Sequence, residues 1–232
     1  MKNNRANTEE QTWDTIAKSF DSTRRKPWVQ CLDFIDELSS QAIVADLGCG
    51  NGRHLLPCAE HCKTVVGVDI SQKLLHITKQ KTKEKNLHNV FFIHGDVRNI
   101  PLKDSSIDAL LYIASLHSIK GRNERIRSLQ EISRILKQDG TALISVWSRW
   151  QDKYRNYFLK QFFIRNQSLE FGDIDIFWRQ HGLDIPRFYH LYSKKEFLED
   201  IIQSGLKIKK MQSVKFYSRY TADNYFALVQ KQ

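Results

Sequence analysis

A glycine-rich turn that follows a short apolar stretch constrains the fold of this chain more than any other sequence feature. Residues 44–52 read VADLGCGNG. The first half has the pattern of a buried β-strand, and the glycines permit positive φ angles and close approach of a ligand to the backbone. This strand–turn–helix pattern predicts a parallel sheet that binds a ligand at the carboxyl ends of its strands.

Strand and helix patterns alternate along most of the chain, which predicts an α/β fold with helices on both faces of a mostly parallel sheet. We expect seven strands, the last two adjacent, at Ala42–Leu47, Thr64–Ile70, Val90–His94, Asp108–Ile113, Thr141–Trp147, Leu206–Ser213 and Tyr225–Gln230. Helices are expected at about residues 53–62, 71–85, 122–136 and 193–204. Ser71 and Ser193 are the predicted N-caps, and residues 138–140 the predicted turn after the third of these helices.

The length of 232 residues suits one domain. We expect a single domain over residues 1–232, with an N-terminal helical segment (about 1–40) and a substrate-side insertion (about 148–190). Residues 148–186 show no clear strand pattern. The first residues form no apolar leader, and no apolar run approaches the roughly 20 residues that cross a bilayer. We therefore expect a soluble, cytoplasmic protein without a membrane partner.

The four cysteines are too few for a disulfide scaffold and are interpreted as reduced thiols. His54, Cys58 and Cys62 would share one helix face, which we interpret as core packing, so no metal site is expected. The net charge of +10 favours anionic partners, above all nucleic acid. A generally lysine-rich surface would give the same charge, and composition does not separate the two interpretations.

Three carboxylates follow three successive predicted strands. Asp46 precedes the first glycine of the turn and favours a positively charged ligand group over a phosphate. Asp69 ends the second strand and can accept hydrogen bonds from both hydroxyls of a ribose. Asp96 follows the third strand and can accept from an adenine amino group, while the backbone N–H of Val97 can reach the ring. Each acid alone fits a turn or a helix cap, but the three together predict a site for S-adenosylmethionine.

These residues resemble the class I S-adenosylmethionine-dependent methyltransferases over about residues 42–146. The resemblance implies a Rossmann-like fold with a seven-stranded sheet. A nicotinamide-dependent dehydrogenase is the competing use of such a sheet, and Asp46 with the glycine spacing disfavours it. The predicted cofactor-binding residues are Asp46, Gly48, Gly50, Asn51, Asp69, Ile70, Asp96, Val97 and Ile113.

Segments outside the cofactor core narrow the family. They read WDTIAKSFD at 13–21, TRRKPW at 23–28, IASLH at 113–117, RFYHLY at 187–192 and DNYF at 223–226. Together they resemble the tRNA methyltransferases that esterify 5-carboxymethyluridine at the wobble position, over about residues 13–230. Ser118 stands where relatives usually have a second histidine, and residues 174–177 diverge from the family pattern.

The resemblance implies a carboxylate acceptor that is already ionised at neutral pH and needs no general base. Catalysis would then come mainly from aligning the reacting atoms. Arg24 and Arg187 are the candidates for holding the carboxylate or a neighbouring phosphate, because guanidinium groups match both. The other candidates are His117 to line the methyl-transfer site, Asp173 to bind the uracil edge, and Tyr189, His190 and Trp178 to stack on the base. Surface charge for Arg24 and core packing for the aromatic residues are the alternative interpretations.

The resemblance also implies two partners, a tRNA substrate and a small zinc-binding activator subunit. The apolar stretches 110–116 and 58–66 are the candidate docking surfaces for that activator. Two other functions stay open at the level of sequence. One is methylation of a small metabolite, and the other is RNA binding without catalysis.

Overall fold

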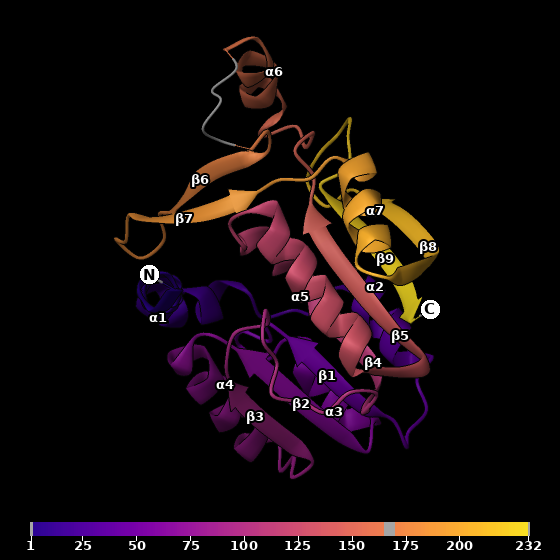
Figure 1. The fold of residues 1–232 in the computed structure, drawn as a ribbon. Helices are drawn as coiled ribbons and strands as arrows, with labels where there is room; N and C mark the ends of the chain where they lie inside the picture. Colours follow the sequence, from indigo (N-terminus) through magenta and orange to yellow (C-terminus); the bar gives the residue numbers. More distant parts are fainter. Residues whose placement is uncertain (1, 165–169, 232) are drawn as a thin grey trace.

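The computed structural model describes residues 2–164 and 170–231, which form one seven-stranded sheet, a separate hairpin and the helices around them (Figure 1). The sheet order is β3-β2-β1-β4-β5-β9-β8, and β9 is antiparallel to both of its neighbours. Its strands are β1 (Ile43–Leu47), β2 (Thr64–Asp69), β3 (Val90–His94), β4 (Ile107–Ile113), β5 (Leu136–Trp147), β8 (Leu206–Val214) and β9 (Asn224–Lys231). The predicted mostly parallel sheet is therefore confirmed, including the adjacent last two strands.

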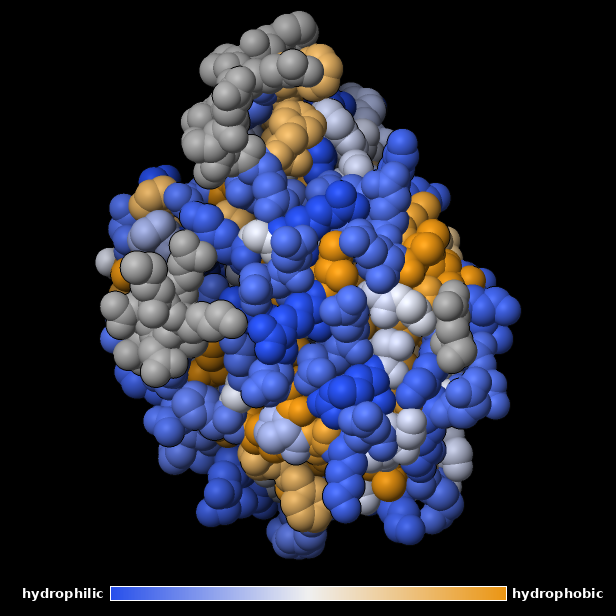
Figure 2. Space-filling view, in the orientation of Figure 1, coloured by the Kyte–Doolittle hydropathy of each residue, from blue (hydrophilic) through white to orange (hydrophobic). Residues whose placement is uncertain are grey.

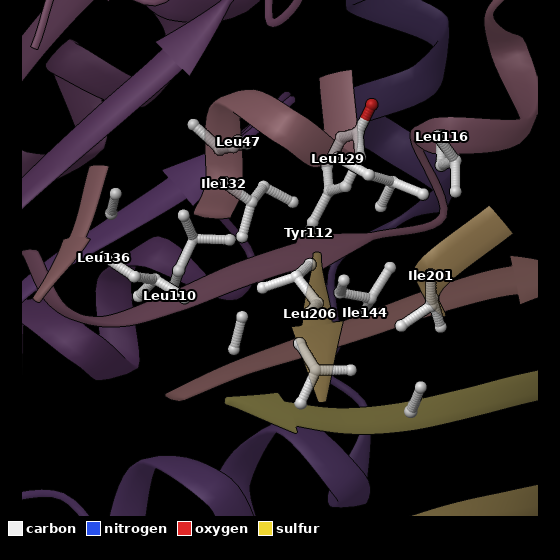
Figure 3. Close-up of a cluster of buried hydrophobic side chains, with 14 of the residues drawn as sticks. Leu47, Leu110, Tyr112, Leu116, Leu129, Ile132, Leu136, Ile144, Ile201 and Leu206 are labelled. Atoms are coloured by element: carbon white, nitrogen blue, oxygen red, sulfur yellow. The ribbon is translucent and has the colours of Figure 1, made fainter. Parts of the chain in front are cut away.

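Two buried clusters, one on each face of the sheet, form the core, because successive strand side chains point to opposite faces. Leu47, Leu110 and Ile144 pack on one face with α5 (Arg122–Ile135) and α7 (Lys194–Gln203), as Figure 3 shows. Val44 and Leu111 pack on the other face with α2 (Val29–Asp36), α3 (Leu55–His61) and α4 (Gln72–Glu84). The outer surface of α5 is mostly hydrophilic (Figure 2).

The predicted helix N-caps are confirmed. The Ser71 hydroxyl accepts a hydrogen bond from Leu74 N–H at the start of α4, at 3.1 Å. Ser193 and Glu196 form a reciprocal capping box at the start of α7. In both places the side chain binds an N–H group that has no partner within the helix.

Strand β5 begins at Leu136, five residues earlier than the sequence predicts. Leu136 is fully buried and pairs with Ile107, after which the register shifts by a bulge before Thr141 pairs with Ala109. Asp139 adopts a positive φ of 64° inside this irregular stretch. The predicted exit turn is thus a distorted first part of the strand, because a buried leucine directly after α5 joins the sheet.

The expectation that residues 148–186 lack a clear strand is wrong. The insertion contains α6 (Arg155–Ile164) and an antiparallel hairpin of β6 (Asp173–Trp178) and β7 (Ile185–His190), while residues 165–169 lie outside the described part. Strand β6 has only one fully buried residue, Trp178, so its hydrophobic pattern is weak. A hairpin outside the main sheet lacks the continuous apolar runs that mark the central strands.

Helix α1 (Lys2–Thr23) connects the sheet with this hairpin. Asp14 accepts from the Ser71 hydroxyl at 2.6 Å, and Ser19 accepts from the indole N–H of Trp178 at 2.8 Å. The N-terminal helix and the β6–β7 hairpin, far apart in sequence, therefore meet near the carboxyl ends of the central strands (Figure 1). Within the described ranges, no helix combines the length and the apolar character that crossing a bilayer requires.

The prediction that residues 110–116 and 58–66 form docking surfaces is wrong. Leu110, Leu111 and Leu116 are fully buried, and Cys58 and Val65 are equally inaccessible. Both stretches are apolar because they belong to the core on either face of the sheet. All four cysteines are free and buried, as expected of reduced core residues.

Adjacent isoleucines on α7 provide a test of the core. Ile201 is fully buried and Ile202 is 61% exposed. We expect Ile201→Ala to lower the free energy of unfolding by about 2–5 kcal/mol, because it removes buried methyl groups and leaves a cavity. Ile202→Ala should change it by less than about 0.5 kcal/mol. Urea unfolding of both variants measures the difference, and equal losses would contradict this placement of α7.

Candidate active site

A pocket opens at the carboxyl ends of β1, β2, β3 and β4, where the strand order reverses between β1 and β4. This reversal is the usual ligand site of open α/β sheets. Helix α1 and the β6–β7 hairpin supply the rest of the wall through Trp13, Phe20, Trp178 and Tyr189. The pocket therefore has a sheet side, built by strand ends, and an aromatic side, built by added segments.

The glycine turn after β1 forms part of the sheet side. Gly48 and Gly50 adopt φ angles of +64° and +55°, a region that other residues rarely enter. A Cβ on Gly48 would lie 2.3 Å from the Ser115 hydroxyl oxygen, so the turn packs directly against the end of β4. The Gly50 N–H donates to Asp69 at 2.7 Å. Both glycines line the pocket, as the sequence predicts.

Asp69 lies at the end of β2, is 6% exposed and lines the pocket. One of its oxygens accepts from Gly50 N–H and the other from Ser71 N–H at 2.8 Å. Burial raises the pKa of this carboxyl to about 6, although the two backbone hydrogen bonds oppose the rise. A carboxylate at this position has further lone pairs with which to accept from ligand hydroxyls.

Asp46 is 2% exposed and lies outside the pocket lining, at the end of β1 beneath the turn. Its Oδ2 atom is buried without a hydrogen-bond partner among the described residues. Burial, and then the charge of Asp69, raise its pKa to about 8. A cationic ligand group close to the turn would relieve both effects, so this orphaned acceptor fits the ammonium of S-adenosylmethionine better than any phosphate.

The remaining predicted cofactor residues all line the pocket, namely Asn51, Ile70, Asp96, Val97 and Ile113. Two of them have partners that the sequence did not predict. The Asp96 carboxylate accepts from the Arg98 side chain at 2.8 Å, so that guanidinium already occupies part of it. The Asn51 side chain donates to Asp21 and to the Arg24 carbonyl, which anchors the end of α1 over the turn.

His117 and Trp147 form the deep part of the aromatic side. The Trp147 backbone N–H donates to His117 Nδ1 at 3.2 Å, so the neutral ring carries its proton on Nε2. Nε2 is buried without a partner among the described residues. Burial, and then the nearby Arg187, lower the pKa of His117 to about 3, so the ring stays neutral. His117 thus provides an unused N–H donor.

Arg187 is 7% exposed and lies over the rings of Trp178, Tyr189 and Trp13, at 4.8, 5.0 and 5.7 Å from their centroids. It donates to the Tyr189 hydroxyl, and no ion pair joins it to a carboxylate within the described part of the chain. Its Nε is buried and unpartnered there. Arg24, the other arginine predicted to meet the acceptor, is exposed and lines the pocket. Its guanidinium lies 5.5 Å from the centroid of the Trp178 ring.

Asp173 and His190 do not line the pocket. His190 is fully buried, with Asp173 on Nδ1 and Glu196 on Nε2, each at 2.8 Å. Glu170 is close enough to complete a possible metal-ligand group with Asp173 and His190, but it pairs with Arg125 at 2.6 Å. Asp173 and His190 therefore belong to a hydrogen-bonded network that joins the hairpin to α7. This geometry disfavours their predicted contact with a base.

Each of the two histidines that line the pocket already uses its accepting ring nitrogen. His117 Nδ1 accepts from Trp147, and His54 Nε2 accepts from the Trp28 backbone N–H at 3.4 Å. Burial raises the pKa of the Cys49 thiol well above its ordinary value, so it is no thiolate nucleophile. This arrangement suits an acceptor that is already a nucleophile at neutral pH.

Sequence reasoning assigned no role to several pocket residues. Arg53 lies over the Trp28 ring at 4.7 Å, and Trp147 stacks on Tyr189 at 5.1 Å. Trp13 and Phe20 form part of the wall from α1. Trp13, Phe20 and Trp28 belong to the N-terminal motifs at residues 13–21 and 23–28. Those motifs indicated the family but not which side chains face the ligand.

Comparisons with known proteins agree with this geometry. A family model described as "Methyltransferase domain" matches residues 45–144. A protein of Encephalitozoon cuniculi, named provisionally as a methyltransferase, is 31% identical over 84% of this chain and 85% of its own length. The tRNA (carboxymethyluridine(34)-5-O)-methyltransferase of Schizosaccharomyces pombe is 27% identical over 95% of both chains.

A third relative is longer than this chain. The tRNA (carboxymethyluridine(34)-5-O)-methyltransferase of Mus musculus is 34% identical over 71% of this chain and 23% of its own length. The match thus spans less than a quarter of that mouse protein.

Two solved structures share the fold. An S-adenosylmethionine-dependent methyltransferase from Methanosarcina mazei has a TM-score of 0.74 at 20% identity, covering 89% of this chain and 98% of its own. A methyltransferase chain from a complex with the Haloferax volcanii Trm112 methyltransferase activator has a TM-score of 0.66 at 17% identity, covering 96% of both. These identities show the fold alone.

The raised pKa values predict a pH dependence of cofactor binding. A bound ammonium requires ionised carboxylates, and Asp46 and Asp69 are partly protonated below about pH 8 and about pH 6. The dissociation constant for S-adenosylmethionine should therefore fall as pH rises from about 5.5 to about 7.5, before the amino group of the ligand itself titrates. Isothermal titration calorimetry measures it.

The isosteric variant Asp46→Asn is the control for that titration. It should bind more weakly and lose the part of the slope between about pH 6.5 and about pH 7.5, because only Asp69 still titrates below that range. A pH profile identical to that of the wild type would show that Asp46 does not interact with the cofactor.

Proposed function

The chain belongs to the class I S-adenosylmethionine-dependent methyltransferases, and we propose that it methylates the carboxylate of 5-carboxymethyluridine at the wobble position of tRNA. Two relatives that match it by sequence carry this activity in their names. The cofactor is S-adenosylmethionine, which supplies an activated methyl group on a sulfonium. The chain's own residues must bind the acceptor, orient it and keep water away.

Two unused donors in the pocket carry the proposal. Arg187 Nε and His117 Nε2 are buried without partners among the described residues, and both residues line the pocket. A buried donor without an acceptor costs about 1–3 kcal/mol, which a ligand oxygen would recover. Two such donors, one of them cationic, match the two oxygens of a carboxylate.

The two donors would hold a carboxylate without taking a proton from it. His117 stays neutral because its pKa is about 3, and Arg187 remains charged. Trp147 and Tyr189 stack on each other beside His117 and shield this part of the pocket from water. Arg24, at the exposed end of α1, would meet the phosphate of the same nucleotide or the carboxylate as it enters.

We also propose a small activator protein as a partner, by analogy with the chain that a methyltransferase activator accompanies in a solved complex. Strand β3 is one edge of the sheet, and its Phe91 is 60% exposed. An exposed edge strand with an apolar side chain is a ready site for pairing with a strand of another protein.

The decisive experiment combines the protein and its activator with labelled S-adenosylmethionine and tRNA that bears 5-carboxymethyluridine. A methyl ester on that nucleoside, released by mild base, is the expected product. The same tRNA with unmodified uridine should stay unlabelled. No label on the modified tRNA would reject the proposal, and turnover of free carboxylic acids without RNA would indicate a small-molecule methyltransferase.

Two adjacent arginines provide a test of whether acceptor binding and cofactor binding depend on different residues. Arg24 lines the pocket, whereas exposed Arg25 does not. We expect Arg24→Ala to lower kcat/KM for tRNA by about 10- to 100-fold, the range for one lost charge-assisted hydrogen bond. The dissociation constant for S-adenosylmethionine should stay within about twofold. Arg25→Ala should act far more weakly, and equal cofactor losses in both variants would contradict this division of roles.

A carboxylate acceptor needs no general base, and this predicts a flat pH profile for methyl transfer. A carboxylate acceptor with an ordinary pKa near about 4 is ionised throughout the neutral range, and His117, with a pKa of about 3, does not titrate there. At saturating cofactor, kcat should therefore vary by less than about twofold between about pH 6 and about pH 9. Single-turnover rates measure it, and an ascending limb of unit slope would instead indicate a hydroxyl or amine acceptor that needs a base.

A further inference from the structure

The loop between β8 and β9, residues 215–223, is held in place by two carboxylates. Asp223 accepts from three successive backbone N–H groups at 2.6, 2.7 and 2.9 Å, and Asp152 accepts from the next two at 2.8 and 3.2 Å. The donors are Phe216, Tyr217, Ser218, Arg219 and Tyr220. Burial alone would raise the pKa values of both carboxyls, but these hydrogen bonds lower them, so both stay ionised. The loop conformation is therefore fixed before any ligand arrives.

This fixed loop presents two tyrosines to solvent. Tyr217 is 97% exposed and Tyr220 is 63% exposed. The guanidinium groups of Arg219 and Arg155 lie 5.4 and 5.7 Å from the Tyr220 ring centroid. A rigid aromatic side chain with a free face loses little conformational entropy when a flat ligand stacks on it.

The loop and the pocket both lie at the end of the sheet where the parallel strands have their carboxyl ends. Strand β8 runs in the same direction as β5, since both are antiparallel to β9, so the loop follows the carboxyl end of β8. Phe216 stacks on Trp28 with ring centroids 4.9 Å apart, and Trp28 lines the pocket. A polynucleotide whose nucleotide enters the pocket would thus pass close to this loop.

The charges around the loop favour an anionic ligand. Lys215, Arg219 and Lys153 are exposed, and Arg155 is half-buried beside Tyr220. The nearby acids, Asp152 and Asp223, accept hydrogen bonds from the loop backbone, and Asp152 also pairs with Arg155 at 3.8 Å. The outward face therefore combines cations with exposed aromatic side chains, which is the composition of surfaces that bind single-stranded nucleic acid.

We propose that residues 215–223 form a base-stacking platform for unpaired nucleotides next to the modified uridine, with Tyr217 and Tyr220 as the stacking residues. Lys215, Arg219 and Arg155 contact the phosphates of those nucleotides. This inference rests on the RNA acceptor of the proposed function and adds a binding surface outside the methyl-transfer pocket. The platform would explain why Tyr217 is almost fully exposed on a loop whose backbone is hydrogen-bonded to two carboxylates.

The test measures binding of the full chain to two RNA probes by fluorescence anisotropy. One is an anticodon stem-loop with an unpaired loop, and the other is a fully paired RNA of the same length. Tyr217→Ala/Tyr220→Ala should raise the Kd for the stem-loop by about 10- to 100-fold, the range for one or two lost stacking contacts. The Kd for the paired RNA should change by less than about twofold, because its bases offer no free faces. Tyr217→Trp should retain stem-loop binding, since stacking needs the ring and not the hydroxyl.

Further measurements separate the platform from a structural role and from the proposed function. The double variant should keep wild-type affinity for S-adenosylmethionine and a wild-type unfolding midpoint, and Ile202→Ala serves as a control for an exposed apolar residue away from the loop. Wild-type stem-loop affinity in the double variant would overturn the platform, as would loss of activator binding with RNA binding intact. If the wild type binds the stem-loop through these tyrosines but esterifies no carboxymethyluridine, the proposed function fails and the platform stands.

Discussion

The geometry of the cofactor site depends on the two hydrogen bonds that the Asp69 carboxylate accepts. One oxygen binds the Gly50 N–H in the turn after β1, and the other binds the Ser71 N–H at the start of α4. A single buried side chain thus fixes two neighbouring strand ends relative to each other. Ser71 extends the connection, because its hydroxyl donates to Asp14 on α1. The N-terminal helix is therefore positioned by the same group of atoms that shapes the cofactor turn.

Helix α1 also joins the cofactor side of the pocket to the acceptor side. Asn51 of the glycine turn donates to Asp21 and to the carbonyl of Arg24, so the end of the helix is fixed over the turn. At Ser19 the same helix binds Trp178 of the hairpin. Trp178 in turn lies beneath both arginines that are proposed to meet the acceptor. The contacts that cover the cofactor turn and those that position the acceptor side of the pocket therefore share helix α1.

The sequence was sufficient to predict the sheet, because buried parallel strands and glycine turns leave strong local patterns. It also indicated which strand ends carry the carboxylates. Side-chain partners that lie far apart in sequence were not predictable in this way. Nothing near Asp173 indicates that His190 will hydrogen-bond to it. Asp96 and Arg98 are only two residues apart, but their pairing depends on the local backbone conformation, which the sequence pattern does not indicate. The β6–β7 hairpin was missed because it packs outside the main core, and the exposure of Tyr217 depends on hydrogen bonds to Asp223.

The pocket has opposite charges at its two ends, and this polarity bears on turnover. Asp69 lines the pocket at the end of β2, and Asp46 lies beneath the turn at the end of β1, outside the lining. Arg187 lies on the hairpin, and Arg24 directly follows α1. The acids favour a ligand with a positive charge, and the arginines favour an acceptor with a negative one. Methyl transfer from a sulfonium to a carboxylate removes one charge from each ligand. With the proposed carboxylate acceptor, each end of the pocket would therefore attract its substrate more strongly than its product, which favours product release.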